Sequence, residues 1–155
     1  MMSAATFSGP QPSGSLPALL GLPRRTAAAT PFAVHDTLLA GLPASVLRHA
    51  VEHVAVLRDQ RHFEGVMAMS LRTYQRLKDD PKRRLDVEAS GRLWRFAEIL
   101  ARAIDLLGSQ EEAERWLVAP AIGLEQRRPI DLMATPTGTA LVEQLLDRID
   151  HGIYA

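Results

Sequence analysis

The longest periodic segment of the sequence, residues 86–108, constrains the fold more than any other feature. Apolar residues recur in "DVEASGRLWRFAEILARAIDLLG" at spacings of three and four, which places them on one stripe of an α-helix: Leu93, Phe96, Ala97, Leu100, Ile104 and Leu107. Gly108 follows the stripe and provides a stop, because glycine readily adopts the left-handed backbone that ends many helices. The sequence therefore predicts one long helix over this segment.

Most of the remaining chain also shows helical patterns. "FAVHDTLLAGLP" predicts a short helix that ends at Gly41 and Pro43, and "ASVLRHAVEHVAVL" repeats apolar residues with a helical period. Ser109 and Glu112 have the spacing of a capping box, and Thr135 precedes Pro136 at the start of a final helix. Because no segment predicts a strand of convincing length, we expect an all-α fold.

The first 31 residues differ in composition from the rest. They contain five prolines with glycine, serine and alanine between them, and such a stretch offers little apolar surface to bury. We therefore predict a disordered or flexible tail over residues 1–31. The folded part then divides into residues 32–96 and residues 97–155, which the long helix joins.

Composition excludes several classes of site. The chain has no cysteine, so it can form neither a disulfide nor a thiolate metal site, and it has no cysteine nucleophile. Absence of cysteine also suits a reducing cytoplasm, which is the location that we expect. No run of about 18 apolar residues occurs, so no membrane span is predicted.

One short motif resembles a metal site. "HAVEH", from His49 to His53, matches the H-x-x-E-H pattern, in which two histidines bind zinc and Glu52 acts as general base. A functional site needs a third ligand and a substrate cleft, and the sequence offers no clear candidate for either. We therefore interpret the motif as a chance match and predict no metal and no cofactor.

The segment "VMAMSLRTYQRLK" has the pattern of a helix-turn-helix. A first helix ends near Val66, and Ser70 can cap a second, whose apolar positions Leu71, Tyr74 and Leu77 would face inward. Arginine and glutamine suit guanine and adenine edges, so the predicted DNA-binding residues are Arg72, Thr73, Gln75, Arg76 and Lys78. The basic run from Lys82 to Arg84 would reach phosphates. An ordinary helical hairpin with a solvated basic face remains an open alternative, because this turn lacks the usual glycine.

Charge is unevenly distributed although the whole chain is formally neutral. Residues 71–84 carry six basic and two acidic side chains, a net charge of +4, whereas residues 98–114 carry one basic and five acidic side chains, a net charge of −4. A local basic patch can hold a phosphate backbone even in a neutral protein.

Taken together, "MSLRTYQRLK", "EASGRLWRFAEILARAIDLLG" and "EEAERWLVAPAIGLEQRRPIDLMATPTGTALVEQLLDRIDHGIYA" resemble the Xre/MbcA/ParS-type antitoxins of bacterial toxin–antitoxin systems. The resemblance runs from about Phe32 to the end of the chain. It implies a helix-turn-helix-like N-terminal domain and a small helical C-terminal toxin-binding domain. It also implies a RES-domain toxin partner that consumes NAD⁺, whose active site the antitoxin blocks, and binding of the complex to its own operator DNA.

The loop "AIGLEQRRP" departs from the family pattern, which usually has a glycine-rich segment here. Gly123 remains, but Glu125 and Gln126 replace a turn of small residues. Position and the preference of interfaces for arginine and tyrosine nominate five toxin-binding residues: Arg127, Arg128, Arg148, His151 and Tyr154.

The resemblance thus predicts an antitoxin without enzymatic activity that forms a homodimer within a larger toxin–antitoxin complex, because two copies are needed to assemble enough phosphate contacts. The alternative is a stand-alone helix-turn-helix repressor whose C-terminal domain serves oligomerisation.

Overall fold

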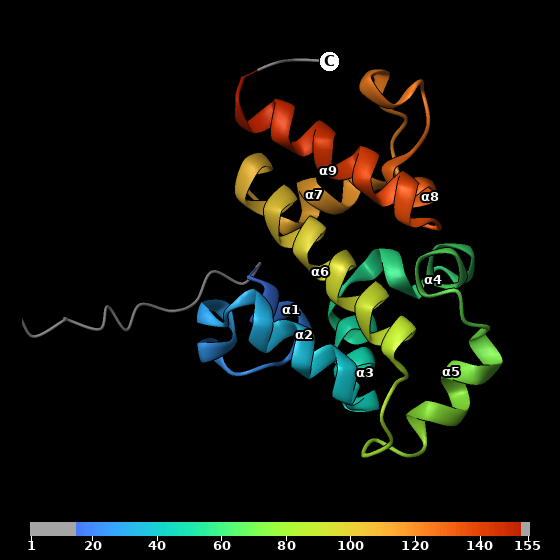
Figure 1. The fold of residues 1–155 in the computed structure, drawn as a ribbon. Coiled ribbons are helices and arrows are strands. Elements are labelled where there is room, and N and C mark those ends of the chain that lie inside the picture. Colours follow the sequence, from blue (N-terminus) through green and yellow to red (C-terminus); the bar gives the residue numbers. More distant parts are fainter. Residues whose placement is uncertain (1–14, 153–155) are drawn as a thin grey trace, which may run out of the picture.

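Helix α6 (Val87–Leu107) runs through the middle of the molecule and contacts elements from both ends of the chain (Figure 1). The Oδ1 atom of Asp86 accepts a hydrogen bond from the Ala89 amide at 2.7 Å and begins the helix, and Gly108 ends it with a φ of 98°. Leu93, Phe96 and Leu100 are buried along its length. The predicted long helix is therefore confirmed.

The computed structural model describes residues 15–152, in which all named elements are helical. Their order is α1 (Leu16–Leu20), η1 (Arg24–Ala28), α2 (Pro31–Ala40), α3 (Ala44–His53), η2 (Ala55–Arg58), α4 (Gln60–Met67), α5 (Leu71–Lys78), α6, α7 (Gln110–Leu117), η3 (Ile122–Leu124), α8 (Pro129–Leu132) and α9 (Pro136–Asp150). Within these residues the only β-type pairings are two isolated bridges. The predicted all-α fold is confirmed, and none of the described helices is long and apolar enough to cross a membrane.

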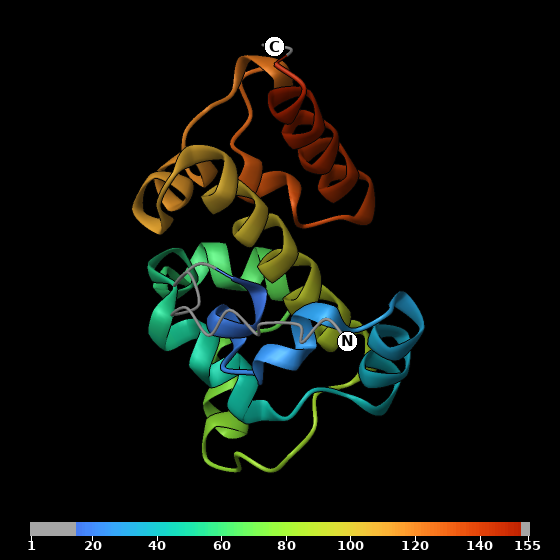
Figure 2. The same ribbon diagram turned by 90° about the vertical axis from the view of Figure 1, so that its left-hand side faces the viewer.

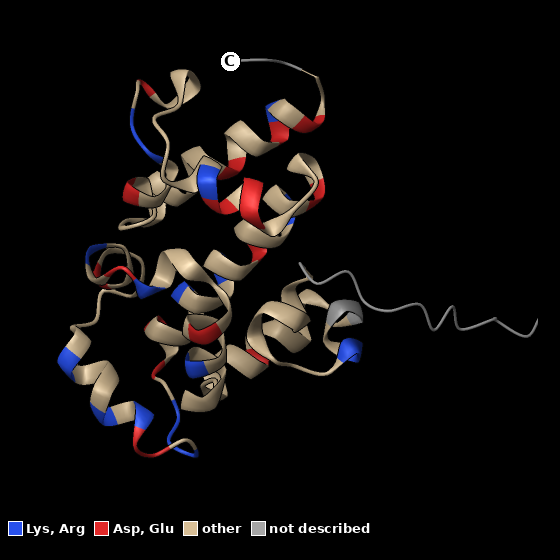
Figure 3. Ribbon diagram, turned by 180° about the vertical axis from the view of Figure 1, so that it is seen from behind, with Lys and Arg blue, Asp and Glu red and all other residues tan. Residues whose placement is uncertain are grey.

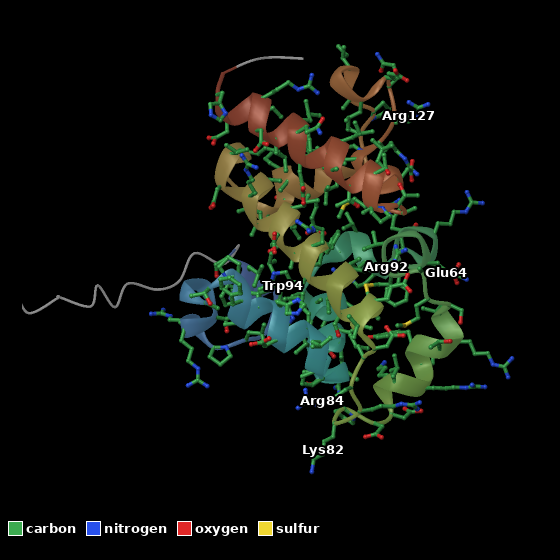
Figure 4. The ribbon with its side chains drawn as sticks, viewed as in Figure 1. Glu64, Lys82, Arg84, Arg92, Trp94 and Arg127 are labelled. Carbon is green, nitrogen blue, oxygen red and sulfur yellow. The ribbon has the colours of Figure 1, made fainter. Side chains whose placement is uncertain are left out.

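The helices form two units that share α6 (Figure 2). In the N-terminal unit, α1, α2 and α4 pack on α6, and α3 and α5 pack on these helices and on each other. Leu47, Phe63 and Leu93 are buried in this unit with almost no exposed surface. Trp94 of α6 is also buried in this unit (Figure 4), as expected for a core residue rather than a ligand-stacking one.

In the C-terminal unit, α7 and α9 pack on α6, and α8 packs on α9 and on α4 of the N-terminal unit. Thr135 caps α9 by accepting a hydrogen bond from the Gly138 amide at 3.0 Å, and Val142, Leu145 and Leu146 form the buried stripe of the helix. Gly138 is itself buried, and a Cβ atom at this position would overlap the carbonyl oxygen of Leu132 in α8. The absence of a side chain therefore lets α8 and α9 approach each other closely.

The prediction of a tail over residues 1–31 is wrong for residues 15–30. Ser15 caps α1, and Leu19 and Leu20 are buried against α3 and α6. Gly21 turns the chain beneath the ring of His49, whose Nε2 atom is 3.0 Å from the Ala18 carbonyl oxygen. Two adjacent leucines thus bury enough surface to order a proline-rich segment. Residues 1–14 lie outside the described residues.

Polar contacts tie the two units together on either side of α6. Glu114 of α7 accepts a hydrogen bond from the Val56 amide at 2.8 Å, and Gln110 donates to the carbonyl oxygen of His53 at 2.7 Å. On the other side, the Nη1 atom of Arg92 donates to the carbonyl oxygens of Val66 and Ala134, both at 3.3 Å (Figure 4). The units are therefore linked by more than the shared helix.

Candidate functional site

The turn between α4 and α5 has the geometry of a helix-turn-helix. Ala68 ends α4 in the left-handed conformation, with a φ of 49°, where a glycine would be under less strain. Ser70 begins α5, and its Oγ atom accepts a hydrogen bond from the Thr73 amide at 3.1 Å. The Thr73 hydroxyl is 3.0 Å from the same oxygen, so this side chain belongs to the cap.

Glu64 braces the two helices across this turn, a role that the sequence reasoning missed. Its Oε1 atom lies at the C-terminal side of α4 and accepts hydrogen bonds from the Leu71 amide at 3.3 Å and from Gln60 at 3.1 Å. Figure 4 shows Glu64 near the end of α4. The backbone amide and the carboxylate are seven residues apart, and no short-range periodicity indicates such a contact.

The two faces of α5 are as the sequence predicts. Tyr74 and Leu77 are buried, and the ring of Tyr74 packs on Phe63 with ring centroids 5.1 Å apart. Burial raises the pKa of the Tyr74 phenol. The five predicted DNA-binding side chains are all exposed: Arg72, Thr73, Gln75, Arg76 and Lys78.

Helical spacing groups three of these residues, Arg72, Gln75 and Arg76, on one face, while Lys78 lies at the last position of the helix. In the described part of the chain, none of Arg72, Arg76 and Lys78 forms an ion pair. Their charges are therefore available to an external anion. The function of this face stays a prediction.

The loop after α5 holds two further basic side chains beside α3. Backbone hydrogen bonds run from Ala44 to the Arg83 carbonyl at 2.7 Å and from Ser45 to the Pro81 carbonyl at 3.2 Å. Lys82 and Arg83 are exposed there and extend the row of basic positions along α5 (Figure 3). Arg84 does not extend this row. Its Nη1 atom donates a hydrogen bond to the Gly41 carbonyl oxygen at 2.6 Å, so one residue of the predicted phosphate-binding run already has a partner within the protein.

In the C-terminal unit, the loop between α7 and α8 is a tight turn made without glycine at its tip. An isolated bridge pairs Ala121 with Arg127, and Glu125 and Gln126 between them both have left-handed backbone, with φ of 53° and 66°. The turn therefore holds two residues in the backbone conformation that glycine adopts with least strain.

Arg127 and Arg128 follow this turn, and each forms an ion pair with a different carboxylate. Arg127 is exposed at the edge of the C-terminal unit and pairs with Glu125 at 2.7 Å (Figure 4). Arg128 forms a two-pronged ion pair with Asp131, at 2.7 and 3.0 Å. The hydrogen bonds that Arg128 donates to Asp131 raise the pKa of Arg128, and the charge of Asp59 at the start of α4 adds to the effect.

The other predicted toxin-binding residues lie at the end of α9. Arg148 is half-buried, and within the described residues its Nε atom is buried without a hydrogen-bond partner. His151 is exposed, and its Nδ1 atom is 2.7 Å from the Asp147 carbonyl oxygen. Tyr154 lies outside the described residues. In the described part of the chain, no hydrogen bond or ion pair joins Arg127 or Arg128 to Arg148 or His151. The role of these residues stays a prediction.

The residues of the H-x-x-E-H pattern have other partners. His49 contacts Ala18, the Nδ1 atom of His53 is 2.8 Å from the His49 carbonyl oxygen, and Glu52 pairs with Arg48 at 3.0 Å. The Arg48 hydrogen bond lowers the pKa of Glu52. Across residues 15–152, no group of three histidine, aspartate or glutamate side chains is placed to hold a metal ion.

Comparison with known proteins assigns a family to both units. Residues 33–98 match the family model described as the antitoxin Xre-like helix-turn-helix domain, and residues 102–152 match the antitoxin Xre/MbcA/ParS C-terminal toxin-binding domain. A protein named Antitoxin Xre from Pseudomonas putida is 33% identical over 141 residues, which cover 88% of this chain and 81% of that protein.

Proteins of the same name from two other bacteria match a shorter part. The one from Yersinia enterocolitica is 35% identical over 92 residues, and the one from Photorhabdus laumondii is 30% identical over 91 residues. These matches cover 59% and 58% of this chain and span 60% and 61% of the two relatives. The family matches in both units and the similarity to the Pseudomonas protein show that the chain belongs to the Xre family of antitoxins.

Proposed function

We propose that this protein is the antitoxin of a toxin–antitoxin pair and acts by binding, without chemistry of its own. Its C-terminal unit covers the active site of a RES-domain toxin that consumes NAD⁺. The observation that carries the proposal is the match of residues 102–152 to a toxin-binding domain. The cognate toxin and the operator DNA are both cytoplasmic partners, and the antitoxin needs no cofactor for either interaction.

The exposed positions of the C-terminal unit support this mode of action. Arg127 lies at its edge (Figure 4), and His151 directly follows α9. Arginine and tyrosine are common anchors of protein interfaces. We propose contacts by Arg127, Arg128, Arg148, His151 and Tyr154.

Co-expression with the protein encoded next to this one tests the proposal. We expect a stable complex by affinity purification and native mass spectrometry, and loss of cellular NAD⁺ when the neighbour is expressed alone. Arg127→Ala combined with Arg128→Ala should weaken toxin neutralisation. Arg115→Ala is the matched control, because Arg115 is another exposed, ion-paired arginine of the same unit. A harmless neighbour that forms no complex would contradict the proposal.

We further propose that two copies of the chain bind operator DNA through α5. The unpaired positive charges of Arg72 and Arg76 support this role, as do Lys82 and Arg83 beside them. Binding to the DNA upstream of the gene can be measured by fluorescence anisotropy at several salt concentrations. Each lost phosphate contact should reduce the slope of log K against log salt by about 1. Lys82→Ala and Arg83→Ala together remove two contacts from each of the two copies, so they should reduce the slope by about 4.

The same face favours one other function. If DNA binding is strong but no toxin partner exists, the chain is a stand-alone repressor and its C-terminal unit serves oligomerisation. The two experiments therefore separate the two functions.

A further inference from the structure

Helix α2 is apolar in composition but buries none of its residues. Seven of the ten residues in "PFAVHDTLLA" are apolar, yet no side chain of α2 is fully buried in the chain. Val34 and Leu38 are partly covered where the helix packs against the core, and the rest are exposed. A helix with apolar residues all round is normally covered on both sides. Within residues 15–152, one side of α2 therefore has no packing partner.

The uncovered side is a single stripe of four residues. Phe32, His35, Asp36 and Leu39 recur at spacings of three and four, which places them together on the helix face opposite Val34 and Leu38. Phe32 is 83% exposed and Leu39 is 60% exposed, the first and third highest values among the large apolar side chains of the described residues. The stripe thus has an apolar residue at each end and a polar pair in the middle.

This order is self-complementary under a two-fold axis, and we propose that α2 pairs antiparallel with α2 of a second copy of this chain. An axis midway between residues 35 and 36 brings Phe32 onto Leu39 of the second copy. It also brings His35 next to Asp36 of the second copy. Every contact then occurs twice, as an interface between identical subunits requires. The imidazole of His35 can donate a hydrogen bond to the facing carboxylate whether or not it carries a charge.

Charge matching distinguishes this partner from a generic apolar ligand. A wholly apolar ligand would leave His35 and Asp36 without partners inside the contact, which costs free energy. The second copy supplies a carboxylate to each imidazole and an imidazole to each carboxylate. Any other register opposes like residues or pairs the polar residues with the apolar ones.

The interface is small, so the association should be reversible. One helix of ten residues from each copy buries less than the roughly 1,200 Å² typical of stable complexes, which points to a dissociation constant in the micromolar range. Helices α2 and α5 lie on different sides of the N-terminal unit (Figures 1 and 2), so pairing through α2 leaves α5 uncovered. The inference locates the two-copy assembly proposed above and does not depend on toxin binding.

Sedimentation velocity of the full-length chain over about 1 to 300 μM tests the pairing, because this range brackets a micromolar equilibrium. We expect a monomer–dimer equilibrium, and Phe32→Glu should raise its dissociation constant at least tenfold. Ile122→Glu is the matched control, since Ile122 is 76% exposed but lies in the C-terminal unit. It should leave the equilibrium unchanged. Because both side chains are exposed, neither variant should unfold the protein, which circular dichroism can verify.

A charge exchange tests the register. His35→Asp places aspartate opposite aspartate in both of the two symmetric central contacts. Asp36→Lys places lysine opposite histidine there. Each single variant should therefore weaken the dimer. The double variant restores opposite charges across the axis and should return the dissociation constant to within threefold of the starting value. Recovery in the double variant is specific to the proposed antiparallel contact, because the two exchanged residues face each other only between copies.

The outcomes separate this inference from the proposed function. A dimer that is insensitive to all α2 variants would overturn the inference and leave two-copy DNA binding standing. A monomer at every concentration would overturn both. If deletion of residues 1–14 creates a dimer that the full chain lacks, the chain's own N-terminal segment covers α2 and the inference is wrong.

Discussion

The α5 face and the loop between α7 and α8 both present arginines to solvent, but the two regions hold them differently. Arg72 and Arg76 stand on a regular, capped helix and have no acidic partner in the described residues. Arg127 and Arg128 stand beside a strained turn, and each is paired with a neighbouring carboxylate. The first surface is ready for phosphates, whereas a ligand of the second must compete with acids already in place.

This contrast suggests two kinds of recognition in one molecule. A long-range attraction governed by salt suits the first surface, because unpaired charges act over a Debye length. Recognition by shape complementarity, in which a ligand replaces the carboxylates that pair with Arg127 and Arg128, suits the second surface. The following variants test how independent the two regions are.

The largest effect should come from Gly138→Ala, which damages the support of the second region. The added Cβ overlaps the Leu132 carbonyl, so α8 and α9 must move apart, and we expect a loss of about 3 kcal/mol in the free energy of unfolding. Urea unfolding followed by circular dichroism measures it. Gly91→Ala in α6 is the control, because open space surrounds that position, and should stabilise the helix by about 0.5–1 kcal/mol. Equal stability of the two variants would contradict the close packing of α8 on α9.

Glu114→Ala should have the next largest effect, because Glu114 links the two units. Its removal leaves the part-buried Val56 amide without its acceptor, which should cost about 1–3 kcal/mol. Glu111→Ala, on the exposed side of the same helix, should cost far less. Hydrogen exchange at η2 would show whether the loss is local. Equal effects of the two substitutions would mean that the carboxylate does not hold the units together.

Ala68→Gly should stabilise the turn of the first region by up to about 1 kcal/mol, because glycine relieves left-handed strain at some cost in chain entropy. Glu125→Gly and Gln126→Gly should do the same in the second region. Ala55→Gly should instead destabilise, since Ala55 is not among the residues with positive φ. Thermal unfolding compares the four variants, and a loss of stability with Ala68→Gly would contradict the described backbone.

The smallest effect should come from Asp59. Its carboxylate caps α4 and interacts electrostatically with Arg128. A hydrogen bond from the His62 backbone amide lowers the pKa of Asp59 below its usual value of 3.8. The carboxylate therefore stabilises the fold above that pH, and the stabilisation is lost as the pH falls through the lowered pKa. Asp59→Asn retains a capping oxygen but cannot titrate. Its melting temperature should fall less than that of the native protein on acidification from pH 5 to about 3. Parallel curves for the two proteins would exclude this role.

How far the sequence predicts these regions depends on the range of the contacts involved. The faces of α5 follow from the period of Leu71, Tyr74 and Leu77, which is a local property. Contacts such as Glu114 with Val56 join residues far apart in the chain, and no periodicity encodes them. The sequence does not predict that α1 is folded, because the composition of this segment resembles that of a linker. Its Leu19 and Leu20 are buried only through contacts with α3 and α6, which lie far along the chain.

The C-terminal loop is an intermediate case. The resemblance predicts that this loop belongs to a toxin-binding segment. The left-handed backbone of Glu125 and Gln126 could not be predicted from it, because these residue types do not favour that conformation. The pairing of Arg128 with Asp131 has helical spacing, so the sequence alone could have predicted it.

The two family matches meet inside α6, between residues 98 and 102, rather than in a flexible linker. Consecutive residues of an α-helix are rotated by about 100°, so inserting one residue at this junction would swing one unit around the other. Hybrid antitoxins that exchange C-terminal halves between relatives must therefore preserve helical phase at the junction. Phase alone is not sufficient, because Glu114 and Arg92 also join the two units directly. An insertion of seven residues, close to two full turns, nearly restores the phase but separates these partners by about 10 Å.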